Sequence, residues 1–211
     1  MKRSTRFAAT LACVAVLTLF LTHAPAQAQY TRLWDLDLSG RNALIVVPPN
    51  DFADSEYFFS RRYLEDLKAT VLVTSLKTDT SHGETRTNKV TPDRALDEID
   101  PNAFDLVVFV GGKGTEALFH EASAQDLALA AMQRDAVVVA FGEALEILAN
   151  AGALKGRRIA CPADLADRLT GAGATVVDRP TTEDGNLFTG RDATVTKRVI
   201  AGAIRKLAAA E

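Results

Sequence analysis

The sequence predicts an α/β fold of three layers, a sandwich in which a mostly parallel sheet carries helices on both faces. Short apolar runs, several of them β-branched and unbroken by polar residues, are typical of strands covered on both faces. These runs alternate with segments of helical periodicity, and such alternation favours a parallel sheet with crossover helices. The predicted strands are 43–47, 70–75, 106–110, 137–141, 158–160, 175–177 and 187–189.

Helical patterns fill the segments between these runs. One of them begins with Thr91 as a capping residue and Pro92 at the first helical position, where proline is well tolerated. The tract 78–88 is polar and predicts a solvated hairpin or loop. No repeat or linker interrupts the alternation, so residues 29–211 are expected to form a single domain. The predicted helices are 55–68, 92–99, 124–134, 143–151, 162–169 and 194–210.

Residues 1–28 have the order of features that is typical of a secretory signal peptide. A basic start is followed by an apolar run over 7–21 and by Ala26-Gln27-Ala28, which predicts cleavage before Gln29. An uncleaved membrane anchor is the alternative, but the apolar run is shorter than the ~20 residues that span a bilayer. We therefore expect an exported protein, periplasmic or extracellular, with no membrane segment after cleavage.

The charge and cysteine content of residues 29–211 narrow the function further. This part holds 21 basic and 27 acidic residues, a net charge of −6, without a basic cluster, which argues against binding nucleic acid or anionic lipid. It contains one cysteine, Cys161, so an internal disulfide is not possible. His82 and His120 lack neighbours in a metal-binding or catalytic pattern. No metal or cofactor is expected.

Candidate functional residues follow the carboxyl ends of the strands, where sites form in sheets of this kind. Glu56 lies in the first turn of a predicted helix, where the helix dipole favours a carboxylate even without a function. Gly111 and Gly112 follow the third strand. Free backbone amides there could hold an anion, and a tight turn is the alternative. Lys113 is not followed by Ser or Thr as in a phosphate-binding loop.

Two further junctions concern a nucleophile. Gly142 and Glu143 follow the fourth strand, at the place of a nucleophile elbow, but this turn contains no Ser, Cys or Thr. Cys161 ends a strand directly before Pro162. It is either a thiol with a lowered pKa at a helix start or, as we favour, a small buried hydrophobic residue.

Taken together, these junctions resemble the PfpI-like protease family, in the superfamily named after the parkinsonism-linked protein DJ-1. The resemblance runs from about Arg41 to Leu207. It implies a flavodoxin-like sandwich of the class I glutamine amidotransferase-like type, and a homodimer is plausible because family members often dimerise. The segments that carry it are 51–56, 91–93, 104–114, 147–158, 171–178 and 184–191.

The sequence departs from the family at the catalytic position. Counting back from Ala151-Gly152, the family's nucleophilic cysteine falls on Gly142 and its following histidine on Glu143. A slip of one residue supplies no thiol either. By resemblance, Glu56 would contact the missing cysteine, and the usual Gly-Pro after the final Arg is replaced by Asp192-Ala193.

Two hypotheses therefore stand. The favoured one is a non-catalytic domain that binds a small molecule or a protein partner in a pocket lined by Glu56, Gly111, Gly112, Gly142 and Glu143. The alternative is an enzyme of the hydrolase or deglycase type with displaced chemistry, which would use Glu56 or Cys161.

Overall fold

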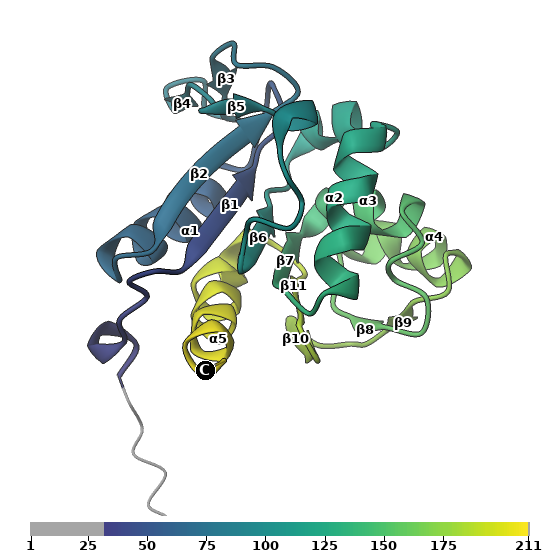
Figure 1. Ribbon diagram of the computed structural model, residues 1–211. Coiled ribbons are helices and arrows are strands. Elements are labelled where there is room, and N and C mark those ends of the chain that lie inside the picture. Colours follow the sequence, from purple (N-terminus) through teal and green to yellow (C-terminus); the bar gives the residue numbers. More distant parts are fainter. Residues whose placement is uncertain (1–31, 211) are drawn as a thin grey trace, which may run out of the picture. The chain divides into compact units, whose positions relative to one another are not determined.

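The computed structural model describes residues 32–210, which contain a central sheet of seven strands (Figure 1). All neighbouring strands are parallel except β10 and β11, at one edge of the sheet, which are antiparallel. This architecture confirms the predicted mostly parallel α/β fold. In spatial order the strands are β10 (Thr181–Asp184), β11 (Leu187–Gly190), β7 (Val137–Phe141), β6 (Leu106–Phe109), β1 (Asn42–Val46), β2 (Thr70–Ser75) and β5 (Arg94–Ala95).

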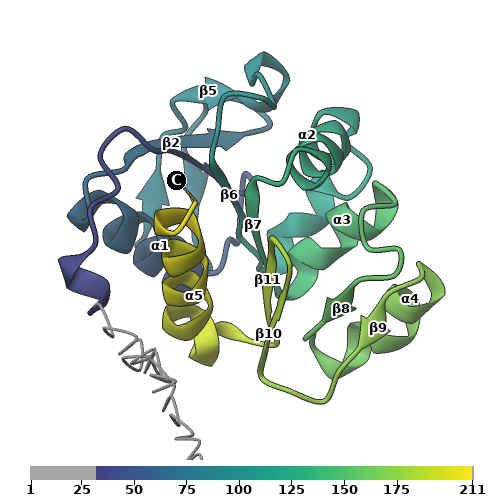
Figure 2. The same cartoon turned by 60° about the horizontal axis from the view of Figure 1, so that its bottom comes forward.

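Helices cover both faces of this sheet, as Figure 2 shows. On one face lie α1 (Asp54–Asp66) and α5 (Thr196–Ala208); on the other lie α2 (Ala122–Gln133), α3 (Leu145–Asn150) and α4 (Ala166–Gly171). The alternation of side chains along a strand divides the core into two layers. Along β1, Ile45 belongs to the layer under α1 and α5, whereas Leu44 belongs to the layer under α2. All four of the central residues 43–46 are fully buried, as the apolar run predicted.

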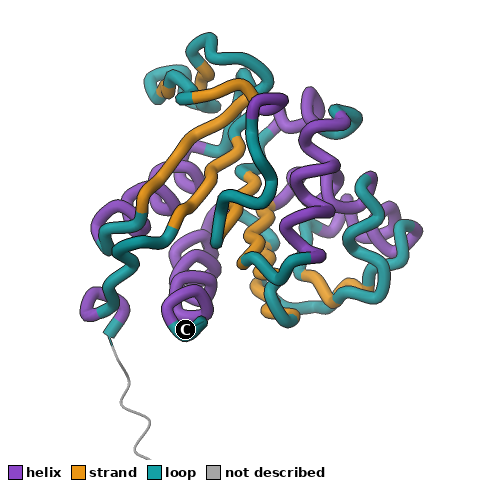
Figure 3. Tube along the Cα trace, in the orientation of Figure 1, coloured by secondary structure: helices purple, strands orange, loops and turns teal. Residues whose placement is uncertain are grey.

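Two small sheets lie outside the central one (Figure 3). The antiparallel pair β3 (Ser81–His82) and β4 (Lys89–Val90) confirms the hairpin expected in the polar tract 78–88. The parallel pair β8 (Arg158–Ile159) and β9 (Thr175–Val176) stands apart from the sheet in which both strands were expected. The place beside β7 is taken instead by the hairpin β10–β11, whose outer strand is too polar to have been recognised.

The predicted helix over 92–99 is wrong. The segment forms the edge strand β5 and then a single 3₁₀ turn, Leu96–Glu98. This segment pairs with β2. The Asp93 amide donates to the Val73 carbonyl, and the Val73 amide donates to Asp93 Oδ2, each at 2.8 Å. Pairing with a neighbouring strand thus outweighs the local helix-start signal of Thr91 and Pro92.

Several helices begin with 3₁₀ turns, which shifts their bounds relative to the prediction. Such turns, Gly142–Ala144, Ala163–Leu165 and Ala193–Val195, precede α3, α4 and α5. The predicted signal peptide over 1–28 lies outside the described residues. Within 32–210, no helix has the length and apolar character needed to cross a membrane.

Candidate functional site

The loops that follow β1, β6 and β7 meet at the carboxyl edge of the sheet. The Ala53 amide donates to the Gly111 carbonyl at 2.9 Å, which ties the first loop to the second. Gly112 has φ +105°, and a Cβ there would lie 2.4 Å from the Asp51 carbonyl oxygen. A Cβ on Gly111 would lie 2.7 Å from the Phe141 carbonyl oxygen. The two glycines therefore allow three loops to pack backbone against backbone.

Glu56 lies under this junction with 3% of its surface exposed. Its Oε2 accepts a hydrogen bond from the Gly111 amide at 2.8 Å. Burial raises the pKa of Glu56 to about 8, an effect that the Gly111 hydrogen bond opposes and the nearby carboxylates of Glu143, Glu84 and Asp192 reinforce. The side chain is thus more than a solvated helix-start carboxylate. Near neutral pH it is largely a carboxylic acid that can donate as well as accept a hydrogen bond.

Gly142 forms the turn between β7 and the 3₁₀ start of α3. Its φ is +48°, which confirms the predicted positive φ. A Cβ built at this position would meet nothing within 4 Å. The carbonyl of the preceding Phe141 borders the Gly111 position, where a Cβ would also come within 3.1 Å of Glu56 Oε2. The turn therefore leaves open space next to the junction that holds the buried carboxyl.

Glu143 accepts a hydrogen bond from the second of the two glycine amides. Its Oε2 accepts from the Gly112 amide at 3.3 Å, while Glu56 takes the Gly111 amide. Of the two interpretations of the glycine pair, an anion site and a tight turn, the structure favours the tight turn, because both amides are hydrogen-bonded within the protein. The protein's own carboxyl groups lie where an anionic ligand would bind, because the chain places an acid directly after Gly142.

The hairpin β3–β4 adds an acidic wall that the sequence did not reveal. The Glu84 amide donates to the Phe52 carbonyl at 3.0 Å, and the Thr85 amide donates to Asp54 Oδ2 at 3.1 Å. A cavity of about 380 Å³ is lined by Asp51, Glu84 and Lys113. Burial raises the pKa of Glu84, with smaller contributions from Asp54 and Glu143 among others.

One signal for this contact was present in the sequence. Gly83 stands inside an otherwise polar tract, and a Cβ there would lie 1.8 Å from Asp54 Oδ1. A lone glycine in such a tract can mark a close approach of two backbones. The partner of that approach, the loop after β1, is more than 25 residues away in sequence and follows only from the fold.

Cys161 is not part of this site. It is 6% exposed and packs in the core layer under α2, α3 and α4. Burial raises the pKa of its thiol, and Asp164 adds to the effect. The expectation of a small buried hydrophobic residue is confirmed. His82 is half-buried and His120 exposed, and within 32–210 no three His, Cys, Asp or Glu side chains are arranged to hold a metal ion.

The fold and this edge define an α/β domain with a strand–turn–helix elbow above a buried carboxyl group. The family model of the DJ-1/PfpI family matches residues 41–201. The chain therefore belongs to the DJ-1/PfpI family, as its motifs predicted.

Known relatives agree with this assignment. An uncharacterized protein of Methanocaldococcus jannaschii is 31% identical over 161 residues, 74% of this chain and 77% of the relative. The deglycase PfpI of Pyrococcus furiosus is 26% identical over 148 residues, 70% of this chain and 89% of the relative. The crystal structure of a ThiJ/PfpI domain protein from Brachyspira murdochii superposes with a TM-score of 0.77 at 26% identity, covering 81% of this chain and 98% of that one.

Proposed function

We propose that this protein is an exported, non-catalytic member of its family that binds a small molecule at the edge formed by Glu56, Gly111, Gly112, Gly142 and Glu143. The observation that carries the proposal is the open, positive-φ turn at Gly142 beside a buried carboxylic acid. A protein partner docking over the same edge would use the same groups. Thiol chemistry has no nucleophile at this turn, since Gly142 has no side chain.

The polarity of the edge favours a particular kind of ligand. Glu56 and Glu143 take up the two glycine amides. Asp51, Glu84 and Lys113 line the adjoining cavity, and Arg86 forms an ion pair with Asp51 at 3.6 Å. The four carboxyl groups around the opening therefore outnumber these two cationic side chains. Such a site favours a ligand with hydroxyl or amino donors, and it disfavours an anion.

The enzymatic alternative has less support, because neither of the groups that it could use, Cys161 and Glu56, stands beside the partner or in the setting that its chemistry needs. Cys161 is buried away from the edge, and burial raises the pKa of its thiol, whereas a nucleophilic cysteine needs a lowered one. Glu56 has a pKa suited to proton transfer at neutral pH, but it would act as acid or base without a nucleophile beside it. At least four of the relatives are named deglycases; by resemblance their thiol position corresponds to Gly142 here.

Metabolite screening on the processed protein tests the proposal. A library of polyols, amines and amino sugars is screened by thermal shift, and each hit is then assayed for turnover, deglycation included. We expect a saturable stabilisation without turnover. Glu56→Gln should weaken binding, while Glu65→Gln, on the exposed face of the same helix, should not. Turnover that survives Cys161→Ala and disappears in Glu56→Gln would establish the enzymatic alternative instead.

Export is a separate part of the proposal with its own measurement. The signal features in residues 1–28 predict that the exported protein begins at Gln29. Intact-mass spectrometry of the secreted or periplasmic fraction would show this start. A species that retains residues 1–28 and fractionates with membranes would contradict it and favour the anchor.

A further inference from the structure

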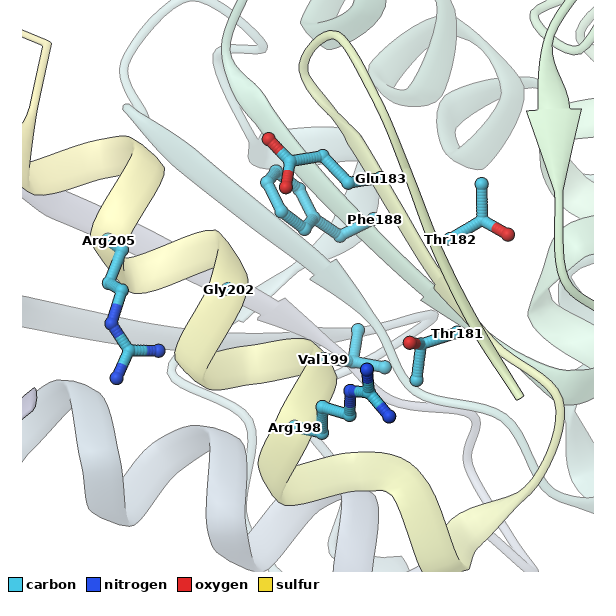
Figure 4. Close-up of a pocket in the computed structure, with 8 residues that line it drawn as sticks. All are labelled: Thr181, Thr182, Glu183, Phe188, Arg198, Val199, Gly202 and Arg205. Atoms are coloured by element: carbon cyan, nitrogen blue, oxygen red, sulfur yellow. The ribbon is translucent and has the colours of Figure 1, made fainter. Parts of the chain in front are cut away.

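A second cavity lies between the edge strand β10 and helix α5, on residues that the site above does not use (Figure 4). It has a volume of about 280 Å³. Thr181 and Glu183 project toward it from β10, and Arg198 and Arg205 flank it from α5. These two arginines are seven residues apart, so they lie on one face of the helix, two turns from each other.

The inner wall of this cavity is apolar and shaped by a glycine. Phe188 is 3% exposed and Val199 is 3% exposed, so both belong to the core with only an edge turned outward. A Cβ on Gly202 would lie 3.2 Å from the Phe188 ring. A glycine inside a helix destabilises it by ~1 kcal/mol relative to alanine. Here the absence of a side chain keeps the helix surface open beside that ring.

Two arginines and one glutamate stand at the rim of the cavity, so the rim carries an excess of positive charge. Neither Arg198 nor Arg205 forms an ion pair with a carboxylate among residues 32–210, in a chain whose net charge is negative. In Figure 4 the guanidinium of Arg198 is turned toward Thr181 and Val199, and the Glu183 carboxyl lies at the other end, beside Phe188. Arg198 and Thr181 therefore offer donors at one end of the cavity. Arg205 and Glu183 stand toward the other end, and the apolar wall lies between the two ends.

We propose that this cavity binds a small aromatic carboxylate, with the carboxylate on Arg198 and Thr181 and the ring against Phe188 and Gly202. A guanidinium pairs with a carboxylate through two parallel N–H···O bonds, which fixes the orientation of the anion. An apolar cavity of about 150 Å³ accepts a benzene ring, so the volume here suffices for a ring and its carboxylate. Toward the Phe188 end the Glu183 carboxyl offsets the positive charge of Arg205, so Arg198 beside Thr181 is the stronger site for the anion.

Benzoate is the probe for the test. The ¹⁵N-labelled protein is titrated with benzoate, with benzylamine, which has a similar ring and the opposite charge, and with acetate, which lacks the ring. We expect saturable shifts of the amides of Thr181, Phe188 and Gly202 with benzoate, and at least tenfold weaker effects with the other two compounds. Equal shifts with acetate would reduce the site to ordinary ion pairing at exposed arginines and overturn the proposal.

Substitutions in the cavity test separately where the carboxylate and the ring of the ligand bind. Arg198→Ala should weaken benzoate binding at least tenfold, whereas Lys206→Ala, which removes one positive charge from the same helix outside the cavity, should change it less than twofold. Gly202→Ala should also weaken binding, because its Cβ narrows the space beside Phe188. Benzoate binding that is unchanged in both Arg198→Ala and Gly202→Ala would refute the proposal.

This inference stands apart from the proposed function. Glu56→Gln should leave benzoate binding unchanged, because no residue that lines this cavity belongs to the Gly142 edge. A loss of benzoate binding in that variant would show that the shifts report the Gly142 edge and would overturn the placement at Arg198.

Discussion

The turns after β7 and β8 differ in whether they carry a thiol and in whether they lie beside the buried carboxyl group. The turn at Gly142 is open, adopts positive φ and adjoins a buried carboxylic acid, but it carries no side chain. The turn at Cys161 carries the only thiol of residues 29–211, yet it lies in the core, where burial raises the pKa of that thiol. Reactivity thus depends on position in the fold. A thiol away from the elbow does not make a catalytic site, and the elbow without a thiol is the binding site that we propose.

The largest expected effect concerns the acid beside the first of these turns. Burial raises the pKa of Glu56 from 4.5 to about 8 in the folded protein, so the folded state keeps a proton that the unfolded state loses. Stability is therefore highest below about pH 4.5 for this group and falls as the pH rises toward 8. At ~1.4 kcal/mol per unit of pKa difference, the total loss is of the order of a few kcal/mol.

Urea unfolding of wild type and Glu56→Gln between pH 5 and pH 8 measures this effect. The difference in unfolding free energy should shift in favour of the glutamine variant as the pH rises. Glu65→Gln, an exposed site on the same helix, serves as the control and should show no such trend. Parallel curves for wild type and Glu56→Gln would mean that Glu56 is ionised in the folded state and that the edge holds no neutral acid.

An intermediate effect is expected from restoring a thiol at the open turn. Gly142→Cys should fold with a loss of ~1–3 kcal/mol, because a residue with a Cβ is strained at positive φ. No atom within 4 Å blocks the new Cβ, so strain is the only expected cost. The new thiol should be alkylated at neutral pH at least tenfold faster than Cys161, since it lies at a helix start, where the dipole favours the thiolate.

Gly142→Ala separates the two parts of this prediction. It introduces the same backbone strain without a thiol, so its stability should match that of Gly142→Cys, and its alkylation should match that of wild type. An inert new thiol, together with unchanged stability of both variants, would show that this turn is not the family's elbow.

The smallest effect is expected at the second turn. Cys161→Ala removes one buried sulfur and should lower the free energy of unfolding by about 1 kcal/mol, within the usual range for single core substitutions. Ligand binding at the Gly142 edge should not change, because Cys161 packs in the layer under α2. A loss of binding or activity in Cys161→Ala, with the fold retained, would make the thiol functional and reverse the comparison between the two turns.

Local sequence signals predicted most of the central sheet but not its borders. The runs 43–47, 106–110 and 137–141 became β1, β6 and β7, because apolar, β-branched runs are stable only when both faces are buried. The run 70–75, with Thr and Ser at its ends, became the less buried strand β2. The signals failed at 92–99 and at β10. In both places, polar residues form strands only because a neighbouring strand offers its backbone.

For the candidate site, too, the sequence predicted the residues but not all of their contacts. Order and spacing of motifs indicated Glu56, the glycine pair and the elbow, and the positive φ of Gly142 followed from the resemblance. Nothing in the sequence predicted that Glu143 would take the Gly112 amide at 3.3 Å or that Glu84 would reach the same edge. These contacts join residues more than 20 positions apart, and their distances depend on how three loops pack.

The sequence by itself determined the α/β class, the family, the missing side chain at the elbow and the presence of a single thiol after residue 28. These are properties of residue type and periodicity, which local physics fixes. Only the tertiary structure decided that Glu56 is a neutral acid, that both glycine amides are occupied by the protein's own carboxyl groups, and that Arg198 flanks a cavity. Burial, pKa and the pairing of charges depend on what surrounds a group, and the fold alone supplies those surroundings.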